Sequence, residues 1–179
     1  MAELRSVATS ELSGAELAAL RRLVEQAFEG RWDEDDWRHT VGGRHLLAVE
    51  GGEVVAHVAV VTRTLVAGDR PLRTGYVEGV ATRADRRRQG LAALVMRAAN
   101  RVIRDGYQLG ALSDGSGIQG FYQRLGWERW QGPTFVATAE GPLRTAEDDG
   151  SVLVLRTPAT GDLDLNGPLV CDWRPGDPW

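Results

Sequence analysis

The feature that most constrains the fold is a β-rich run at 72–81 that leads, through a strongly basic turn, into the longest amphipathic pattern of the chain. Apolar residues repeat at helical spacing along that pattern until Gly106 ends it, at Leu91, Leu94, Val95, Ala98 and Val102. A second apolar run follows at 107–112. A strand, a helix and another strand in this order predict a β-α-β unit with its two strands in one sheet.

The segments on either side of this unit carry the signals of further helices and hairpins. Upstream we expect a helix from the capping box Ser13-Gly14-Ala15-Glu16 to Gly30, a short acidic helix from Asp33 to about 42–43, strands at 45–49 and 54–61 joined through Gly51-Gly52, and a turn at 68–71. Downstream we expect a loop and short helix at 113–125 capped by Gly126, a strand at 127–130, a last regular strand at 151–155, and an irregular tail from Pro158. This order predicts an α+β fold, with a mixed, mostly antiparallel sheet flanked by helices, in a single domain over residues 1–179.

The composition is that of a globular protein, with 42% hydrophobic and 26% charged residues. The first residues lack the basic-then-apolar order of a signal peptide, and no apolar run approaches the roughly 18 residues that a membrane span needs. We therefore expect a cytoplasmic protein without a membrane partner. Cys171 has no Cys or His neighbour at metal-ligand spacing, so we expect no metal and a packing role for this thiol.

Charge is distributed unevenly along the chain. Seven arginines and one acid lie between Arg83 and Arg104, whereas eight acids and three arginines lie from Glu140 onward. A net charge of −4 argues against nucleic acid as a partner. The two clusters fit an enzyme with one anionic and one cationic substrate, and the alternative for each cluster is a merely solvated face.

The basic turn Arg86-Arg87-Arg88-Gln89-Gly90 lies where a strand passes into a helix. Successive backbone N–H groups at such a helix start form a concave anion site, and the helix dipole adds a favourable potential. Small residues let a diphosphate approach the backbone, and arginines can reach the outlying phosphates. The turn therefore predicts a diphosphate site, with a solvated basic helix start as the alternative.

Within this turn, Arg87-x-x-Gly90-x-Ala92 resembles the (Arg/Gln)-x-x-Gly-x-(Gly/Ala) loop with which the GNAT acetyltransferases hold the pyrophosphate of coenzyme A. The resemblance implies a GNAT fold in which the strands at 75–82 and 107–112 splay apart and hold acetyl-CoA. It implies acetyl-CoA contacts from Val80, Ala81, Thr82, Arg87, Arg88, Gln89, Gly90, Leu91 and Ala92. Backbone near Val80 and Thr82 would hold the pantetheine arm and polarise the thioester carbonyl.

The same resemblance singles out two residues for proton transfer. The segment from Gly120 to Trp127 has the family's Phe-Tyr-x-x-x-Gly-aromatic form, which implies that Tyr122 protonates the departing thiolate. Glu78, on the strand that meets the thioester, is the expected base that accepts the amine proton directly or through water. The alternatives are a core aromatic role for Tyr122 and an arginine-paired structural role for Glu78. Direct attack in a ternary complex needs no enzyme nucleophile, and the chain has no lysine.

A narrower resemblance spans nearly the whole chain. Segments similar to the aminoglycoside 2′-N-acetyltransferases are Asp36-Trp37, His39-Thr40, Gly42-Gly43, 75–80, 107–113, Gly132-Pro133-Thr134, Asp148-Asp149-Gly150, 171–174, Gly176-Asp177 and Trp179. The resemblance implies that the drug is held by Asp36, Glu78, Gly79, Ser113, Asp148, Asp177 and the α-carboxylate of Trp179. Gly30-Arg31 stands where the family has Gly-Asp, and this departure either narrows the drug range or is compensated by Asp33 or Asp35.

These resemblances imply acetyl transfer to the 2′-amine of aminoglycosides, hence antibiotic resistance, by a homodimeric enzyme. Two alternatives stay open. One is transfer to another polycationic amine, such as a polyamine, amino sugar or peptide, and the other is an acyl-CoA-binding regulatory domain without catalysis. We expect structural roles for His39, His45 and His57, which show no ligand spacing, and core or interface positions for most of the tryptophans.

Overall fold

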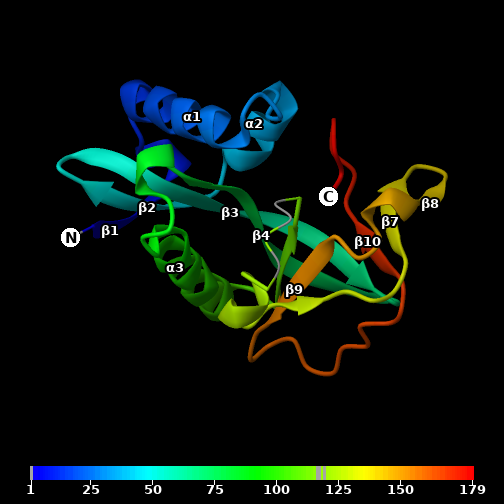
Figure 1. The fold of residues 1–179 in the computed structure, drawn as a ribbon. Coiled ribbons are helices and arrows are strands. Elements are labelled where there is room, and N and C mark those ends of the chain that lie inside the picture. Colours follow the sequence, from blue (N-terminus) through cyan, green and yellow to red (C-terminus); the bar gives the residue numbers. More distant parts are fainter. Residues whose placement is uncertain (1, 116–117, 119) are drawn as a thin grey trace. The chain divides into compact units, whose positions relative to one another are not determined.

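The computed structural model describes residues 2–115, 118 and 120–179, and Figure 1 draws the chain as a ribbon. The chain divides into two compact units. The first unit comprises the chain up to Val61 together with Val77–Arg101, and the second comprises Thr62–Tyr76 and Val102–Trp179. Three long elements contribute residues to both units, namely β3 (Glu53–Ala67), β4 (Arg70–Thr82) and α3 (Leu91–Gly106). The single domain expected over 1–179 stays a prediction.

Three antiparallel strands start the sheet of the first unit. β1 (Glu3–Ala8) pairs with β2 (Arg44–Glu50), and β2 pairs with the first part of β3. The β2–β3 hairpin confirms the turn predicted at Gly51-Gly52, and its register shifts by one residue between Ala48 and Val49. The β-branched run in β3 is almost completely buried, as its composition predicts.

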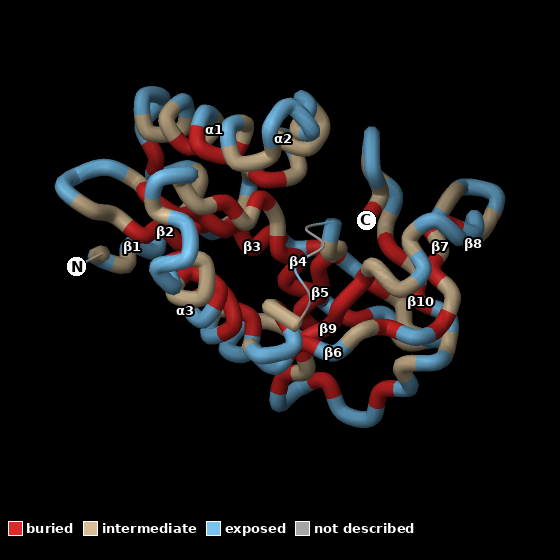
Figure 2. The backbone as a smooth tube through the Cα atoms, in the orientation of Figure 1, coloured by how far each residue is buried: buried red, intermediate tan, exposed pale blue. Residues whose placement is uncertain are grey.

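Helices cover both sides of the strands of the first unit, with α1 (Gly14–Phe28) and α2 (Glu34–Thr40) on one side and α3 on the other (Figure 1). α1 begins with the predicted capping box, because Ser13 and Glu16 each bond to the other's backbone amide. Its inner face packs on β1 and β2 through Leu20, Val7 and Leu47. Figure 2 shows this pattern of buried inner and exposed outer helix faces.

The strands of the second unit follow the order β6-β9-β5-β4-β3-β10-β7-β8. Those not yet introduced are β5 (Leu109–Ser113), β6 (Glu128–Arg129), β7 (Thr134–Thr138), β8 (Gly141–Arg144), β9 (Val152–Arg156) and β10 (Leu169–Cys171). β4 pairs in parallel with β5 at Thr74–Tyr76, and β10 is parallel to β7. The pairs β5–β9, β6–β9, β7–β8 and β3–β10 are antiparallel, so the predicted mixed, mostly antiparallel sheet is confirmed.

The sequence missed β1, β7, β8 and β10. The expectation that 151–155 holds the last regular strand is wrong, since β10 follows in the tail expected to be irregular from Pro158. β10 has only three residues, and its position depends on its partners β3 and β7 more than on its own pattern. The short helix expected within 113–125 is one 3₁₀ turn, η3 (Gln123–Leu125), while positions 116, 117 and 119 lie outside the described residues.

None of the helices in the described part of the chain combines the length and apolar character that a membrane span requires.

A buried guanidinium fastens the C-terminal segment to β3 within the second unit. The Arg63 side chain is 4% exposed and donates to the Asp172 carboxylate at 2.9 Å, to the Asp172 carbonyl at 2.7 Å and to the Pro178 carbonyl at 2.7 Å. It also lies over the Tyr76 ring, with Cζ 4.7 Å from the ring centroid. Three hydrogen bonds to one buried charge make this contact structural.

Substitution of Arg63 with Met should lower the free energy of unfolding by about 2–3 kcal/mol, because two backbone carbonyls lose charge-assisted hydrogen bonds. Arg5→Met is the matched control. It removes the ion pair between Arg5 and Glu16, whose side chains are 44% and 38% exposed, and should leave the urea midpoint nearly unchanged because water screens this pair. Urea unfolding of both variants measures the difference. Equal losses in the two variants would contradict the structural role of Arg63.

Candidate active site

The basic turn between β4 and α3 lies wholly within the first unit. After one 3₁₀ turn, η2 (Ala84–Arg86), the backbone adopts the left-handed conformation at Arg88 (φ 63°) and Gly90 (φ 80°), and α3 begins at Leu91. Where left-handed residues alternate with residues of ordinary negative φ, neighbouring backbone N–H groups point toward the same side and can bind an anion there. A Cβ atom on Gly90 would meet no described atom within 4 Å, so this backbone is open to a ligand. The turn therefore fits the predicted diphosphate.

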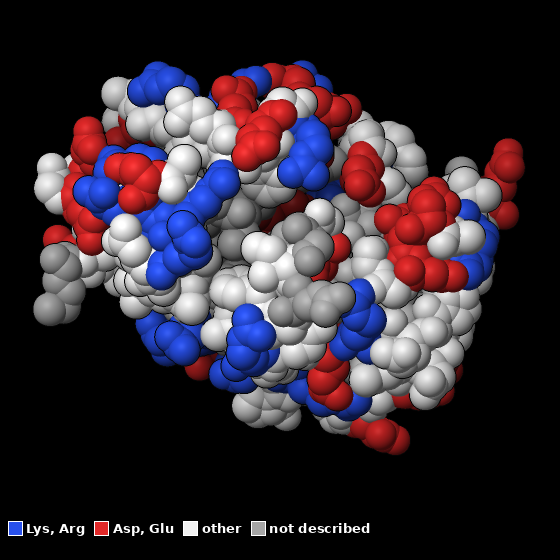
Figure 3. All heavy atoms as spheres, viewed as in Figure 1, with Lys and Arg blue, Asp and Glu red and all other residues white. Residues whose placement is uncertain are grey.

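The arginines of this turn divide into two kinds. Arg83 and Arg86 both bond to Asp85 and to further carboxylates on the β2–β3 hairpin, so they shape the turn. Arg87 and Arg88 are exposed, and these are the two that the sequence assigns to phosphate. Arg87 makes one long, exposed ion pair to Glu29, at 3.8 Å. Basic and acidic side chains accordingly interleave on the surface in Figure 3.

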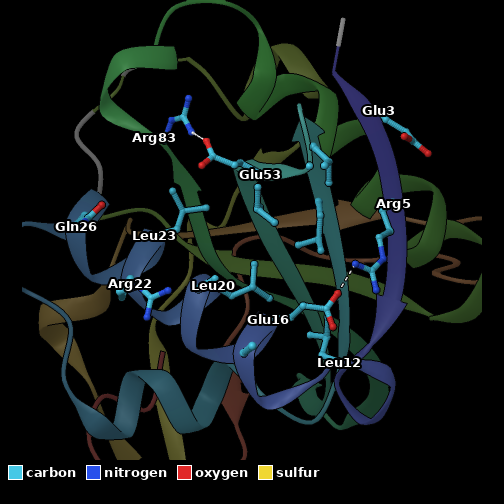
Figure 4. Close-up of a pocket in the computed structure, with 16 residues that line it drawn as sticks. Glu3, Arg5, Leu12, Glu16, Leu20, Arg22, Leu23, Gln26, Glu53 and Arg83 are labelled. Carbon is cyan, nitrogen blue, oxygen red and sulfur yellow. Dashed lines mark hydrogen bonds and ion pairs between the residues drawn. The ribbon is translucent and has the colours of Figure 1, made fainter.

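A cavity of about 710 Å³ lies between α1 and the strands of the first unit (Figure 4). Its apolar lining includes Leu12, Leu20, Leu23, Leu47 and Val54. The ion pairs Arg5–Glu16 and Arg83–Glu53 lie along it, as Figure 4 shows. None of the predicted site residues lines this cavity, so we do not assign it to either substrate.

The predicted pantetheine-binding residues and the predicted base occupy the last part of β4. Glu78 and Val80 are half-buried and lie on either side of Gly79, while Ala81 is buried against α1. Gly79 has a φ of 59° inside the strand. A glycine in this conformation is typical of a β-bulge, where the strand leaves its regular ladder and redirects the groups beside it.

A chain of hydrogen bonds runs to this glycine from the interior of the first unit. Thr9 Oγ1 lies 2.8 Å from His45 Nε2, His45 Nδ1 lies 2.9 Å from His57 Nε2, and His57 Nδ1 lies 2.7 Å from the Gly79 carbonyl oxygen. Both rings are fully buried. The β2–β3 register makes this contact possible, because His45 pairs with Ala59 and is therefore diagonal to His57 on the same face.

The hydrogen bond to the Gly79 carbonyl determines which atom is the donor in each of the other bonds of this chain. A carbonyl oxygen only accepts, so His57 Nδ1 carries a proton and His57 Nε2 accepts from His45 Nδ1. His45 Nε2 then accepts from the Thr9 hydroxyl, whose contact with the Gly43 oxygen is longer, at 3.2 Å. Burial lowers the pKa of His45 to about 4 and that of His57 to about 3, so both rings are neutral at pH 7.

The predicted drug ligand Asp36 lies in the first turn of α2. Its Oδ2 accepts a hydrogen bond from the Asp33 amide at 3.0 Å, and Asp33 Oδ1 accepts from the Asp36 amide at 2.9 Å. Asp36 therefore closes a capping box in addition to any contact with substrate. Figure 3 shows acidic side chains gathered over α2, which gives this end of the first unit a negative surface.

In the second unit, Tyr122 immediately precedes η3 and is 7% exposed. Its ring packs edge-on against Phe121 and Trp127, with centroid separations of 5.0 and 6.4 Å. Burial raises the pKa of Tyr122 above its usual value, and the charge of Asp114 raises it further. The phenol therefore stays protonated at neutral pH, as a proton donor must, although this packing also suits a core aromatic.

Two of the predicted drug ligands, Asp148 and Asp177, lie together in the second unit. Burial is the main cause that raises the pKa of Asp148 to about 6, and the charges of Asp177 and Glu147 act in the same direction. Asp149 behaves differently, because the Arg144 guanidinium lowers its pKa to about 2. A carboxyl group whose pKa is raised, beside a second carboxylate, is an arrangement that a bound cation would complete.

Hydrogen bonds hold the segment that carries Asp177. Its carboxylate accepts from the Trp179 amide at 2.9 Å, and Arg174 donates to the backbone oxygens of Asp177 and Trp179 at 2.9 and 3.1 Å. The Trp179 ring is buried, and its Nε1 donates to Thr145 Oγ1 at 2.9 Å. The remaining predicted ligand, Ser113, ends β5 with its hydroxyl 3.2 Å from that of Ser151.

Solved structures with this fold are GNAT acetyltransferases. The chain matches a GNAT family N-acetyltransferase from Escherichia coli in complex with CoA with a TM-score of 0.67 and 17% identity, over 95% of this chain and 89% of that one. It matches a GCN5-related N-acetyltransferase from Kribbella flavida with a TM-score of 0.58 and 27% identity over 73% of its length, and spans only 35% of that chain. The fold is therefore that of the GNAT class.

Sequence comparison identifies the family within this class. The family described as "Acetyltransferase (GNAT) domain" matches residues 8–130. The aminoglycoside 2′-N-acetyltransferase of Mycolicibacterium fortuitum is 47% identical over 177 residues, which is 98% of this chain and 91% of that protein. The chain belongs to the GNAT acetyltransferases and, within them, to the family of the aminoglycoside 2′-N-acetyltransferase, which confirms the resemblance noted in the sequence.

The sequence predicts a structural role for His45 and His57 and does not connect them to the strand that carries Glu78. A usable signal was present, because both histidines interrupt aliphatic strands of one predicted hairpin. Only the register, which includes the shift between Ala48 and Val49, shows that the two rings meet.

Affinity for a polyammonium ligand should rise as the pH increases from 5 to 7, because Asp148 ionises near pH 6 and adds a negative charge beside Asp177. Asp177→Asn removes one charge that raises the pKa of Asp148, so the midpoint should move to lower pH. Titration calorimetry with tobramycin at several pH values measures both effects. Asp162→Asn is the control, since this exposed acid is not among the groups that raise the pKa of Asp148. An unchanged midpoint in Asp177→Asn would contradict the coupling.

Proposed function

We propose that this chain transfers the acetyl group of acetyl-CoA to the 2′-amino group of aminoglycoside antibiotics and thereby confers resistance. The observation that carries the proposal is the 47% identity to the Mycolicibacterium fortuitum enzyme over 98% of the chain. The charges agree with it, since an aminoglycoside carries several ammonium groups and both units present carboxylates.

Acetyl-CoA is held, in this proposal, by the turn before α3 and by the end of β4. The backbone of Arg88, Gln89 and Gly90 binds the diphosphate, and the Arg87 side chain reaches it from the surface. Support comes from the two left-handed residues of the turn and from the open space at Gly90. Leu91 and Ala92 start α3 behind the phosphates, and the backbone of Val80, Ala81 and Thr82 holds the pantetheine arm.

The reaction requires two proton transfers. The amine nitrogen attacks the thioester carbonyl carbon, and Glu78 accepts the amine proton directly or through water. The carbon–sulfur bond then breaks, and Tyr122 donates its proton to the departing thiolate. No covalent enzyme intermediate is needed, and Cys171 is unsuited to form one because burial raises its pKa to about 11.

Carboxylates hold the drug in this proposal. We assign its ammonium and hydroxyl groups to Asp36, Glu78, Gly79, Ser113, Asp148, Asp177 and Trp179. The raised pKa of Asp148 supports this assignment, because a bound ammonium group would offset the repulsion between Asp148 and Asp177.

We also propose the homodimer that the family resemblance implies. Leu143 and Trp173 in the second unit are 60% and 65% exposed, and a second copy could cover such apolar side chains. Light scattering of the purified protein tests this assembly.

Incubation of the enzyme with acetyl-CoA and tobramycin should give a monoacetylated drug, modified at the 2′-nitrogen. Mass spectrometry counts the acetyl groups, and NMR of the product determines the position. Spermidine and a peptide amine serve as comparison acceptors. Turnover of only these two, or acetylation of tobramycin elsewhere, would contradict the proposed function.

Tyr122→Phe should lower kcat by about 100-fold while acetyl-CoA binding is retained, because the phenol acts only when the thiolate departs. Tyr107→Phe is the matched control. Tyr107 is half-buried in the same unit, and its hydroxyl lies 3.0 Å from that of Thr62. Thiol release gives kcat, and calorimetry gives the acetyl-CoA affinity. Equal kcat values for the two variants would remove Tyr122 from the mechanism.

A further inference from the structure

We propose that His57, supported by His45 and Thr9, is a positioning residue for acetyl transfer, because it holds the Gly79–Val80 peptide so that the Val80 N–H points at the thioester carbonyl. The inference rests on the proposed role of the Val80 backbone in binding acetyl-CoA. It extends that role to Thr9, which directly follows β1, to His45 of β2 and to His57 of β3, none of which the acetyl-CoA and drug assignments use.

The geometry of one peptide plane carries the first step. The Gly79 carbonyl and the Val80 amide belong to the same peptide, and the described chain contains no cis peptide bond. In a trans peptide the C=O and N–H bonds point in opposite directions. His57 Nδ1 fixes the carbonyl oxygen at 2.7 Å, so the Val80 N–H is fixed in the opposite direction.

Burial makes this hydrogen bond costly to lose. His57 is fully buried, and its neutral ring has one donor and one acceptor, both of which are used. A rotation of the Gly79 peptide would leave the His57 N–H without an acceptor, and an unsatisfied buried donor costs about 1–3 kcal/mol. Because His45 and Thr9 fix the ring from its other nitrogen, the ring cannot follow the carbonyl.

The packing around Gly79 further restricts rotation of the Gly79–Val80 peptide. A Cβ atom there would lie 3.4 Å from the His57 ring and 3.4 Å from the Thr40 side chain. Thr40 is itself fully buried, and its hydroxyl donates to the Asp36 carbonyl at 3.0 Å. The left-handed φ of Gly79 thus puts its carbonyl against the histidine with no side chain in the way. A donor held in place before the reaction is the arrangement that stabilises a developing oxyanion.

The test compares three variants. His57→Leu removes the donor to Gly79, whereas His57→Asn keeps an N–H group at the position of Nδ1. Val58→Ala creates a cavity at the next residue of β3, which is fully buried and points to the opposite face, so it controls for lost stability. With tobramycin as acceptor, kcat should fall between about tenfold and a hundredfold in His57→Leu, while the KM for acetyl-CoA changes less than about threefold. His57→Asn should recover most of kcat, and Val58→Ala should keep it.

An infrared measurement reads the hydrogen bond itself. The carbonyl stretch of bound acetyl-CoA, labelled with ¹³C at the carbonyl, should lie at lower frequency than in solution for the parent, His57→Asn and Val58→Ala. It should return toward the solution value in His57→Leu. No acceptor is present in this measurement. A shifted carbonyl in an enzyme that fails to acetylate tobramycin would contradict the proposed function and leave the positioning role supported.

Several outcomes would overturn the inference. One is an unchanged kcat and an unchanged carbonyl band in His57→Leu. Another is an equal loss of kcat in Val58→Ala and His57→Leu when the two variants are equally destabilised. Lost stability, and not the lost hydrogen bond to Gly79, would then explain the lower kcat. If His57→Leu does not fold, the ¹⁵N shifts of the parent histidines decide, because the proposed chain requires Nδ1–H on both rings, and Nε2–H on His57 would exclude it.

Discussion

The left-handed glycine in β4 is the constraint on which the site of the first unit depends. Strand carbonyls ordinarily bond to the neighbouring strand, and a carbonyl turned away from that ladder needs another donor. Gly79 meets this need with a buried imidazole N–H at 2.7 Å, and only glycine adopts its φ of 59° without steric cost. The residues on either side, Glu78 and Val80, therefore take directions that a regular strand would not give them.

The charged side chains of the turn before α3 fix the shape of this turn. The turn before α3 is strongly basic, yet Arg83 and Arg86 pair with carboxylates of the β2–β3 hairpin and of the turn itself, and Arg87 lies 3.8 Å from the Glu29 carboxylate. Such exposed ion pairs contribute little to stability, but they fix the shape of a short segment with left-handed residues at Arg88 and Gly90. The anion site then depends on backbone geometry, and the exposed Arg87 and Arg88 add long-range attraction.

Short sequence patterns predict the helix starts and turns that depend only on residues adjacent in the chain. The capping box at Ser13, the turn at Gly51-Gly52 and the helix start after Gly90 each depend on a few adjacent residues, and all are confirmed. β10 could not be predicted in this way, because its three residues become a strand only between β3 and β7.

The same distinction applies to the site. The turn and the segment around Tyr122 were identified from short motifs, whereas the bond from His57 to Gly79 joins two strands and depends on a register shift. The repulsion between Asp148 and Asp177 likewise comes from residues far apart in the chain. The family resemblance singles out these two aspartates as drug ligands. No pattern in the sequence predicts that their side chains lie close to each other.

The raised pKa of Asp148, which burial causes chiefly and the charge of Asp177 increases, affects the stability of the fold. The pKa of Asp148 is raised in the folded protein to about 6 from an ordinary value of 3.8, so between these values the folded state binds more protons than the unfolded state. Stability therefore falls as the pH rises through this window, and at neutral pH the ionised Asp148 is a destabilising group. The fold nevertheless holds Asp177 beside it with hydrogen bonds from Trp179 and Arg174. An arrangement that weakens the free protein and is relieved by a cation is more readily explained by ligand binding than by folding.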